Sequence, residues 1–396
     1  MAEGLRHVRV LMVVPKYPYP VVGGLERQAH ELSKALSGLG IEVWALSHLF
    51  DGSQLASEVV EGIWVRRIPW SDRKAFRFAR APFDLMWTLW RYRRSYEIVH
   101  LHQFSWFSIY VTLAAKLLGK QVMMKLSTVG TRSLPGLAAS RLGGIKLAIF
   151  RMTDVVIAMS RQSLDELCDI HFPPGRILMT PNGIPVGPHD VRMEDAAERP
   201  ALCRVVFVGR LNPEKRVEDL LNAWKAVVAG CSRPTSLELW GGGPLEPGLR
   251  ALCTQLGIAD TVVFRGHVDA VRDHLRDMQI FVLTSSREGN SNAVLEAMAA
   301  GLPVISTRVG GTPMLVGPAG ADWLVEPGDV SGLGKCLLKL IEDDTTRRQV
   351  GQAMRERIVA HFDMRRVAGT YAAAYGLLAS GRRNQVSAAS DPVVSG

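Results

Sequence analysis

The sequence predicts an α/β protein with two doubly wound parallel sheets, and three observations support this fold class. Short apolar runs alternate with segments of helical spacing, which is typical of a parallel sheet with crossover helices. Residues 186–200 interrupt the alternation with prolines, clustered charges and no periodicity, as an interdomain linker would. The same alternation then begins again, and 396 residues are enough for two domains with full hydrophobic cores.

The first half of the chain has the pattern of one Rossmann-like domain, expected at residues 1–187. The run 8–15 is apolar apart from Arg9, which favours a strand buried on both faces. Residues 23–40 follow with leucine and alanine at helical spacing and end at Gly40. Further strands are expected at residues 41–47, 97–102, 122–130 and 154–160.

The second half repeats this order and predicts another Rossmann-like domain at residues 200–362. A long amphipathic helix is expected from Ser331 to His361. The helix at about 366–380 should pack back on the N-terminal domain, and the polar residues 381–396 are expected to be a disordered tail. The other expected elements are strands at 204–210, 237–243, 261–266, 280–286 and 303–306, with helices at 217–228, at 249–256 and from Asn292.

Composition indicates a soluble globular protein without disulfides or structural zinc. Apolar residues make up 47% of the chain and charged residues 21%. No uncharged stretch reaches the roughly 20 residues that a membrane span needs. The cysteines form no CxxC or Cys/His cluster, so a reducing cytoplasm is the expected compartment. They are Cys168, Cys203, Cys231, Cys253 and Cys336.

The net charge of +9 is concentrated in the first half of the chain. Residues 1–190 carry 23 Lys/Arg against 15 Asp/Glu, whereas residues 191–396 carry 24 against 23. The stretch Trp64–Arg94 alone holds nine basic residues, two acidic residues and four tryptophans. Tryptophan among arginine suits an anionic membrane surface, which here would be the inner face of the membrane. A solvated basic face is the alternative, and nucleic acid is disfavoured because no recognition motif accompanies the charge.

Part of this basic stretch must also belong to the fold. Phe83, Leu85, Met86 and Leu89 have the spacing of the buried face of a helix. On that interpretation the tryptophans of the stretch could be core residues as well.

Two glutamates, Glu288 and Glu296, lie on either side of the helix start expected at Asn292. Glu288 belongs to a glycine- and asparagine-rich loop, and Glu296 lies one turn into the helix, whose side chains lean toward its N-terminus. Both carboxylates can therefore face one cleft, beside backbone N–H groups that favour phosphate. Since a carboxylate only accepts hydrogen bonds, the pair suits sugar hydroxyls. Two solvated surface glutamates are the alternative.

Five motifs identify a family that the sequence resembles. They occur in the order GGLE (23–26), PNGI (181–184), GRLNPEK (209–215), FRGHV (264–268) and EGNSNAVLEAMAAGLPVI (288–305), the last with its two glutamates eight residues apart. In these motifs the sequence resembles the glycosyltransferases of family 4, which have the GT-B architecture. The resemblance spans nearly the whole chain. It implies two Rossmann-like domains that face each other across a cleft, and transfer of a hexose from a UDP- or GDP-linked sugar.

The resemblance implies catalytic roles for Arg210, Lys215 and Glu288. The two cations would stabilise the leaving diphosphate, and physical reasoning agrees, because fixed charges act most strongly where charge develops in the transition state. Glu288 would bind a hydroxyl of the transferred sugar, and Glu296 would hold the nucleotide ribose. Two solvated loop cations are the alternative for Arg210 and Lys215.

The remaining donor contacts implied by the resemblance involve backbone groups. Gly23 and Gly24 lack side chains that would keep the phosphate away, and the backbone at His267 and Val268 would meet the base. Ala270 stands where some relatives carry an acidic base-reading residue, so guanine specificity gains no support. The expected donor-binding residues are Gly23, Gly24, Gly209, Arg210, Lys215, His267, Val268, Glu288, Gly289, Asn290, Ser291, Asn292, Ala293 and Glu296.

The sequence departs from the family at a histidine that many relatives place close to the transferred sugar. The corresponding strand reads VMMKLSTVG, which leaves Lys125 or Ser127 at that position. His102 matches a different recurring histidine, on the acceptor side or deeper in the domain. These three residues are candidates for contact with the sugar or the acceptor.

The expected chemistry needs no metal and no cofactor. No DxD motif lies between apolar strands, and the pair Asp343–Asp344 falls in a polar segment after a helix. The resemblance implies a retaining transferase, and front-face displacement is favoured because no enzyme nucleophile is evident. The acceptor is expected to be a glycan or a lipid-linked precursor. A nucleotide-sugar epimerase of the same architecture and a non-catalytic scaffold remain the alternatives.

Overall fold

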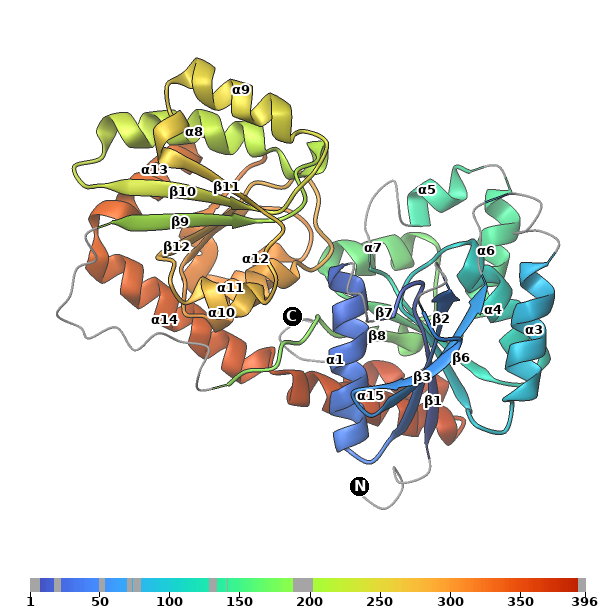
Figure 1. Ribbon diagram of the computed structural model, residues 1–396. Coiled ribbons are helices and arrows are strands. Elements are labelled where there is room, and N and C mark those ends of the chain that lie inside the picture. The colour runs from blue at the N-terminus through green and yellow to red at the C-terminus, as the bar shows by residue number, and fades with distance from the viewer. Residues whose placement is uncertain are drawn as a thin grey trace. The chain divides into compact units, whose positions relative to one another are not determined.

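The computed structural model describes residues 8–17, 23–49, 54–69, 73, 80–127, 134–140, 142–187 and 202–390. The chain divides into two compact units (Figure 1). Unit 1 comprises Met1–Pro185 together with Met364–Gly396, and unit 2 comprises Val186–Asp363. Most of the expected linker, residues 188–200, lies outside the described residues.

Unit 1 contains, within its described residues, an eight-stranded sheet in the order β3-β4-β2-β1-β5-β6-β7-β8. Neighbouring strands pair in parallel, except that β3 and β4 are antiparallel. The strands are β1 Arg9–Val13, β2 Glu42–Leu49, β3 Ser57–Val60, β4 Ile63–Pro69, β5 Ile98–Leu101, β6 Gln121–Lys125, β7 Val155–Ala158 and β8 Ile177–Met179.

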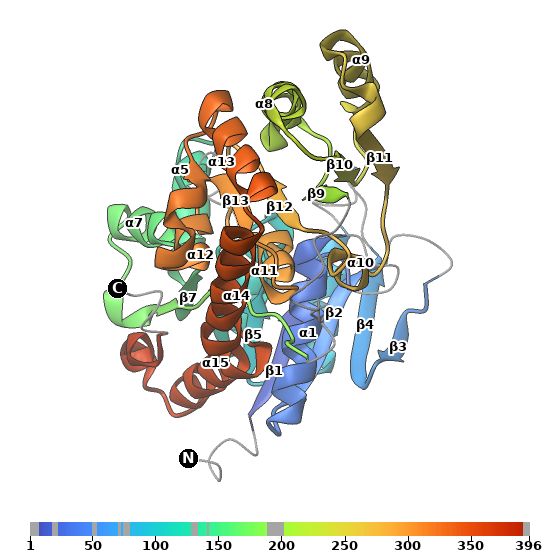
Figure 2. The same cartoon turned by 90° about the vertical axis from the view of Figure 1, so that its left-hand side faces the viewer.

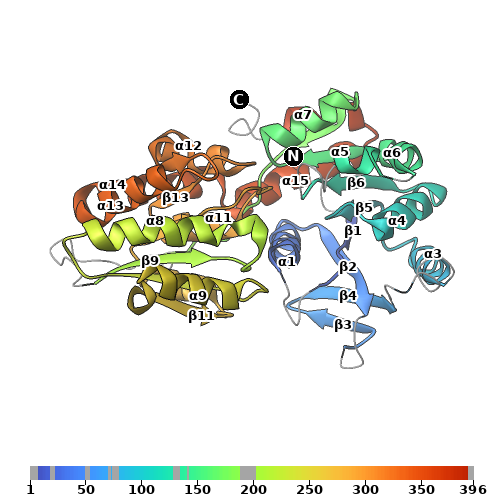
Figure 3. The same ribbon diagram turned by 90° about the horizontal axis from the view of Figure 1, so that it is seen from above.

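Helices cover both faces of this sheet (Figure 3). On one face α1 and α15 pack together and enclose the main apolar core of the unit with the strands. On the other face α3, α4 and α6 lie side by side. The helices are α1 Gly24–Gly38, α3 Ala81–Arg91, α4 Trp106–Leu117, α5 Leu134–Ala138, α6 Gly143–Arg151, α7 Arg161–Asp169 and α15 Met364–Ala379, with the 3-10 turns η3 Pro174–Arg176 and η8 Arg383–Ala389.

Unit 2 contains, where the structure describes it, a six-stranded parallel sheet in the order β11-β10-β9-β12-β13-β14. The strands are β9 Cys203–Val208, β10 Thr235–Trp240, β11 Val262–Gly266, β12 Ile280–Leu283, β13 Val304–Thr307 and β14 Leu324–Val325. The helices are α8 Val217–Gly230, α9 Glu246–Leu256, α10 Val271–Leu275, α11 Asn292–Ala299, α12 Thr312–Gly320, α13 Val330–Glu342 and α14 Asp344–His361, with the 3-10 turns η5 Pro213–Lys215, η6 Ala259–Thr261 and η7 Ala321–Trp323.

Both sheets confirm the predicted fold class, a pair of doubly wound α/β domains. In each unit the strand order reverses direction next to the first strand, between β1 and β5 in unit 1 and between β9 and β12 in unit 2. Open α/β sheets bind ligands beside the carboxyl ends of the strands at such a switch point. Ligand-binding residues are therefore expected in the segments that follow β9 and β12, and in those that follow β1 and β5.

The single long helix expected at Ser331–His361 is wrong. The structure has two helices there, α13 and α14, with Asp343 in an extended conformation between them. The Asp343 carboxylate accepts hydrogen bonds from the backbone N–H and the hydroxyl of Thr346, at 2.9 and 2.6 Å, and so caps α14. Helix α14 then lies beside α11 and α12 (Figure 2).

The disordered tail expected at residues 381–396 is also wrong as far as residue 390; residues 391–396 lie outside the described part. Residues Arg383–Ala389 form η8, whose Val386 is fully buried in the core of unit 1. Arg383 pairs with the buried Asp154 at 2.8 Å, and the Ser390 hydroxyl accepts a hydrogen bond from the backbone N–H of Met179 at 2.9 Å. These contacts fix a segment whose own composition is polar.

Candidate active site

The segments after β9 and β12 bring Lys215 and Glu288 into direct contact. The Lys215 Nζ lies 2.5 Å from the Glu288 Oε1, and both side chains are largely buried. Lys215 ends η5, a turn that begins five residues after β9, and Glu288 lies five residues beyond the end of β12. Two predicted catalytic residues 73 positions apart thus form one ion pair at the carboxyl ends of adjacent strands.

Hydroxyl groups after β12 hold the two segments together. The Ser285 hydroxyl donates to Glu288 Oε1 at 2.6 Å, so this carboxylate oxygen has two donors. The Thr284 hydroxyl donates to the carbonyl of Lys215 at 2.8 Å, and the Ser286 hydroxyl donates to the carbonyl of Glu214 at 3.1 Å. The run Thr284–Ser286 was not among the predicted site residues. Three consecutive hydroxyl side chains at the carboxyl end of a buried strand were the signal for it.

A second omission is Gly310, in the segment after β13. Its φ is +53°, and a Cβ there would come within 1.6 Å of the Glu288 carbonyl oxygen. The adjacent Gly311 donates its N–H to the carbonyl of Gly289 at 2.8 Å. Only glycine fits such a close approach at a positive φ. Gly310 therefore sets the position of the backbone that carries Glu288, and the GGT sequence after an apolar strand was the available signal.

Helix α11 begins at Asn292, as predicted, with Ser291 as the N-cap residue. The Ser291 side chain makes no capping hydrogen bond to this N-terminus. Asn290 and Ser291 are buried, Gly289 and Ala293 are partly buried, and Glu296 is buried in the second turn. The N-terminus of α11 thus presents backbone donors and a positive helix end beside the Lys215–Glu288 pair.

The other predicted residues of unit 2 lie at the same edge of the sheet, and they are exposed or only partly buried. Arg210 follows β9 and is exposed, while the adjacent Gly209 donates its backbone N–H to the carbonyl of Trp240 at 2.9 Å. His267 follows β11, is mostly exposed and lies 3.3 Å from Asp269. Val268, next to it, is partly buried.

In unit 1, Gly23 is the N-cap of α1 and Gly24 is its first residue. Residues 18–22, which precede them, lie outside the described part of the chain. The Gln28 side chain, one turn further on, donates to the carbonyl of Gly183 in the PNGI motif at 2.7 Å. The two glycines therefore start a helix that is tied to the segment after β8.

His102 and Lys125, two of the candidates for sugar or acceptor contact, are buried in unit 1. His102 stacks on His100 with the ring centroids 4.3 Å apart, and both rings are buried. The Lys125 Nζ donates to the Asn182 side chain at 2.7 Å. Of the three candidates at the departure from the family pattern, Ser127 alone is partly exposed.

Burial shifts the protonation of this interior cluster. Loss of solvation lowers the pKa of Lys125 to about 7. Burial, together with the Lys125 charge, holds the pKa of His100 well below its usual value, and His102 behaves likewise. The His100 ring is hydrogen-bonded to the Tyr375 hydroxyl of α15 at 2.7 Å. The cluster therefore joins strands β5 and β6 to the returning C-terminal helix.

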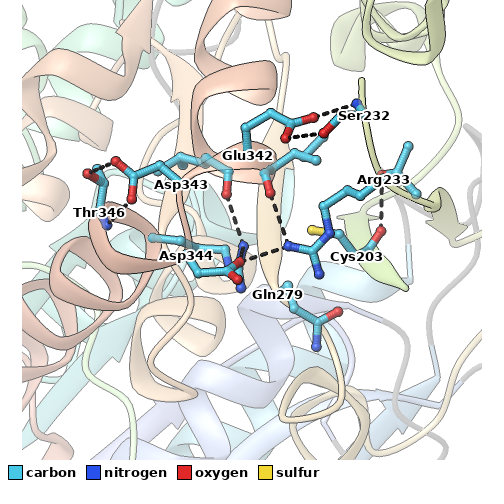
Figure 4. A network of polar contacts seen from close by, with 12 residues as sticks. Cys203, Ser232, Arg233, Gln279, Glu342, Asp343, Asp344 and Thr346 are labelled. Carbon is cyan, nitrogen blue, oxygen red and sulfur yellow. Dashed lines mark hydrogen bonds and ion pairs between the residues drawn. The ribbon is translucent and has the colours of Figure 1, made fainter. Parts of the chain in front are cut away.

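The Asp343–Asp344 pair takes part in a structural network (Figure 4). Asp344 Oδ1 lies 2.8 Å from Arg233 and 2.5 Å from Arg347. Burial alone would raise the pKa of Asp344, but the charges of Arg347 and Arg233 lower it. Among the described His, Cys, Asp and Glu residues, no three gather where they could hold a metal ion. No helix in the described part of the chain is long and apolar enough to cross a membrane.

Two family models match this chain. The model of glycosyltransferase family 4 matches residues 22–187, and the model of the glycosyl transferases of group 1 matches residues 203–343. Between them they cover most of both units and include the Gly23, Lys215 and Glu288 segments. The chain belongs to the family 4 type of glycosyltransferases, and its fold is the GT-B fold. This confirms the resemblance seen in the five motifs and identifies the protein as an enzyme.

Full-length relatives support this assignment. The chain is 26% identical to N-acetyl-alpha-D-glucosaminyl L-malate synthase from Bacillus anthracis, covering 90% of this chain and 94% of the relative. It is 28% identical to glycogen synthase from Mycobacterium tuberculosis, covering 95% and 96%. The solved structure of Anabaena HepE in complex with UDP-glucose shares the fold with a TM-score of 0.74 at 18% identity, covering 94% of this chain and all of that one.

Proposed function

We propose that this glycosyltransferase is a retaining, metal-independent hexosyltransferase that uses a nucleotide-diphosphate sugar and acts on a lipid-linked or envelope-glycan precursor. The observation that carries the proposal is the Lys215–Glu288 ion pair at the switch point of the unit 2 sheet. It places a cation, a hydrogen-bond acceptor and a helix N-terminus in one region, which is what a diphosphate attached to a sugar requires.

Lys215 and Arg210 are the proposed leaving-group stabilisers. When the glycosidic bond breaks, negative charge grows on the β-phosphate, and nearby fixed cations lower the barrier without the solvent reorganisation that water would need. The Lys215 ammonium forms an ion pair with Glu288. A bound diphosphate would compete with that carboxylate for the ammonium, and the exposed Arg210 would add a second charge.

Glu288 and Glu296 are the proposed acceptors for donor hydroxyls. Glu288 Oε1 is engaged by Lys215 and Ser285, which fixes the orientation of the carboxylate toward a sugar hydroxyl. Glu296 would accept from the ribose. The backbone of Gly289–Ala293, with that of Gly209, would surround the phosphates, and Gly23 and Gly24 are the proposed contribution of unit 1.

A UDP-linked sugar is the donor to test first. The HepE structure contains UDP-glucose, and the likeness of fold makes the same class of donor a reasonable starting point. The proposed base contact is the backbone at His267 and Val268. Ala270 offers no carboxylate to a guanine, so the sequence does not favour GDP.

The acceptor cannot be transferred from the relatives, because the names of two of them point to acceptors as different as malate and glycogen. The proposal of a lipid-linked acceptor rests on unit 1 instead. Its basic and aromatic stretch Trp64–Arg94 is suited to an anionic membrane surface. Retention rests on the family likeness, with the leaving phosphate accepting the proton of the attacking acceptor hydroxyl.

The test is release of nucleotide from a panel of UDP- and GDP-linked hexoses, with and without a membrane-lipid extract as acceptor. We expect one donor to release nucleotide faster when the extract is present, with the anomeric configuration retained in the product. Donor converted to its epimer without nucleotide release would indicate an epimerase. No turnover of any donor would contradict the proposal.

Metal independence is tested in the same assay. Because Lys215 and Arg210 would neutralise the diphosphate, EDTA should leave the rate of transfer essentially unchanged. Loss of transfer in EDTA that Mg²⁺ or Mn²⁺ restores would show that a metal ion neutralises the diphosphate instead.

A further inference from the structure

Helix α3 exposes an aromatic face to solvent. Phe83, Trp87 and Trp90 are 77%, 62% and 43% exposed, and their spacing places them on one side of the helix. We call these three residues the aromatic face of α3. Large aromatic side chains gathered in this way are rare on a surface that meets only water.

The opposite side of α3 is the one that supports the fold. Leu85, Thr88 and Leu89 are buried, and α3 packs against α4 and β4. The prediction that Phe83 lies on the buried face of this helix is therefore wrong, because its side chain faces solvent. By contrast Trp64, from the same basic stretch, is partly buried, and its ring lies tilted against that of the buried Trp44 with the centroids 5.0 Å apart. Trp64 therefore packs within the unit, whereas Trp87 and Trp90 face solvent.

Cations lie next to the aromatic face. Arg93 lies over the Trp90 ring at 4.5 Å, and Trp87 and Trp90 contact each other at 5.2 Å. Arg91 and Arg94 are exposed at the same end of the helix. Arginine held against an aromatic ring keeps its charge near the water boundary while the ring enters an apolar phase.

The neighbouring helices continue this character. Helices α4 and α6 lie in the same layer as α3, and no acidic residue occurs between Glu97 and Asp154 in the sequence. Leu117 at the end of α4 and Ile145 on α6 are also exposed, at 78% and 59%. The three helices carry a single carboxylate, Asp84, so their acidic content is low enough for an approach to anionic headgroups.

We propose that the aromatic face of α3, with Arg91, Arg93 and Arg94, docks unit 1 on an anionic lipid bilayer. The aromatic rings enter the headgroup region and the arginines contact lipid phosphates. The proposal deepens the proposed function, since a lipid-linked acceptor would be met at that surface. An aromatic patch of this kind also suits a second copy of the chain, but repeated arginines facing one another across a twofold contact would repel.

The experiment is flotation of the full-length protein with phosphatidylcholine vesicles that contain graded fractions of phosphatidylglycerol. Wild type should float in proportion to the anionic fraction, and salt should release it. Changing Phe83, Trp87 and Trp90 together to serine should weaken binding by about tenfold or more, as should Arg91→Gln with Arg94→Gln. Matched controls are serine at the equally exposed Leu39, Leu55 and Val59 of unit 1, and Arg276→Gln with Arg348→Gln in unit 2.

Three results would overturn the proposal. The first is that the wild-type protein does not float with anionic vesicles at low salt. The second is that the aromatic-face variant floats as well as wild type. The third is that wild type sediments as a dimer and the aromatic-face variant as a monomer. The last would assign the face to a second copy of the chain. Vesicle binding needs neither donor nor transfer, so failure of the proposed function in the donor panel would be seen separately.

Discussion

Lys125 is the residue whose surroundings depart most from those of an ordinary lysine. Its side chain is 5% exposed, and the partner that its ammonium contacts, Asn182, carries no charge. His100 and His102 are neutral neighbours, and the Tyr371 ring of α15 lies 6.0 Å from the ammonium. Burial is costly for the charged form of a side chain, so the pKa of Lys125 falls to about 7.

This burial predicts a stability that rises with pH. The folded-state pKa of about 7 lies below the ordinary value of 10.5, so between these limits the unfolded chain binds a proton that the native chain does not. The free energy of unfolding should therefore increase by up to about 1.4 kcal/mol per pH unit above pH 7. The cost of the buried charge is fully present below pH 7 and disappears toward pH 10.5.

The check is urea unfolding of wild type and Lys125→Met at several pH values between about 8 and 9, above the ordinary pKa of histidine and below that of tyrosine. The variant should lose most of the pH dependence and be the more stable protein at pH 8. An equal pH slope in both proteins would show that Lys125 is not the group responsible.

At the scale of elements, the junction of α13 and α14 is held by two adjacent aspartates with different tasks. Asp343 caps α14, whereas Asp344 joins Arg233 and Arg347, whose side chains are only 6% and 4% exposed (Figure 4). Removing Asp344 would leave two buried guanidinium groups without this carboxylate.

Asp344→Ala should therefore lower the free energy of unfolding by about 3 kcal/mol or more, and Asp343→Ala should lower it less. Because the pKa of Asp344 is lowered in the folded state, its contribution is complete above the ordinary value of 3.8 and is lost as the pH falls through the folded-state pKa. Urea unfolding of the two variants at pH 7 measures the difference. An equal loss of unfolding free energy in both variants would show that the contacts of Asp344 with Arg233 and Arg347 contribute no more than the Asp343 cap.

The segment after β13 gives a second prediction at this scale. An alanine at Gly310 would meet the Glu288 carbonyl and would also be strained at φ +53°. Gly257 has φ +70° but open space around its Cβ position, so alanine there would cause backbone strain without a steric clash. Gly310→Ala should reduce transfer at least tenfold through displacement of Glu288, whereas Gly257→Ala should cost only about 1 kcal/mol of stability. Full activity of Gly310→Ala would remove Gly310 from the account of the site.

At the scale of the whole molecule, the fold was predictable because its signal is repeated. The alternation of buried strands and amphipathic helices occurs twice, and the start of α11 followed from the loop residues before Asn292. The sequence also predicted that Lys215 and Glu288 serve the same donor site, because each follows a strand next to the switch point, but it did not predict that they form an ion pair.

What sequence reasoning missed depends on tertiary contacts. Phe83 has core spacing, but α3 turns it toward solvent, and Lys125 ends a strand but points inward. The segment Arg383–Ala389 looks disordered by composition, and becomes ordered because Asp154 and Met179 supply partners. The role of Gly310 depends on a backbone oxygen 22 positions earlier in the chain. None of these contacts can be recognised from hydrophobic periodicity in the local sequence.

The central claim is that Lys215, which is paired with Glu288, stabilises the leaving diphosphate. Its most direct test is kcat for transfer by Lys215→Ala, measured with the donor found in the panel and with Lys225→Ala, an exposed lysine on α8, as the matched control. We expect Lys215→Ala to lower kcat by about 100-fold or more while the protein remains folded at the assay temperature, and Lys225→Ala to behave as wild type. A Lys215→Ala enzyme within a few fold of wild type would contradict the claim.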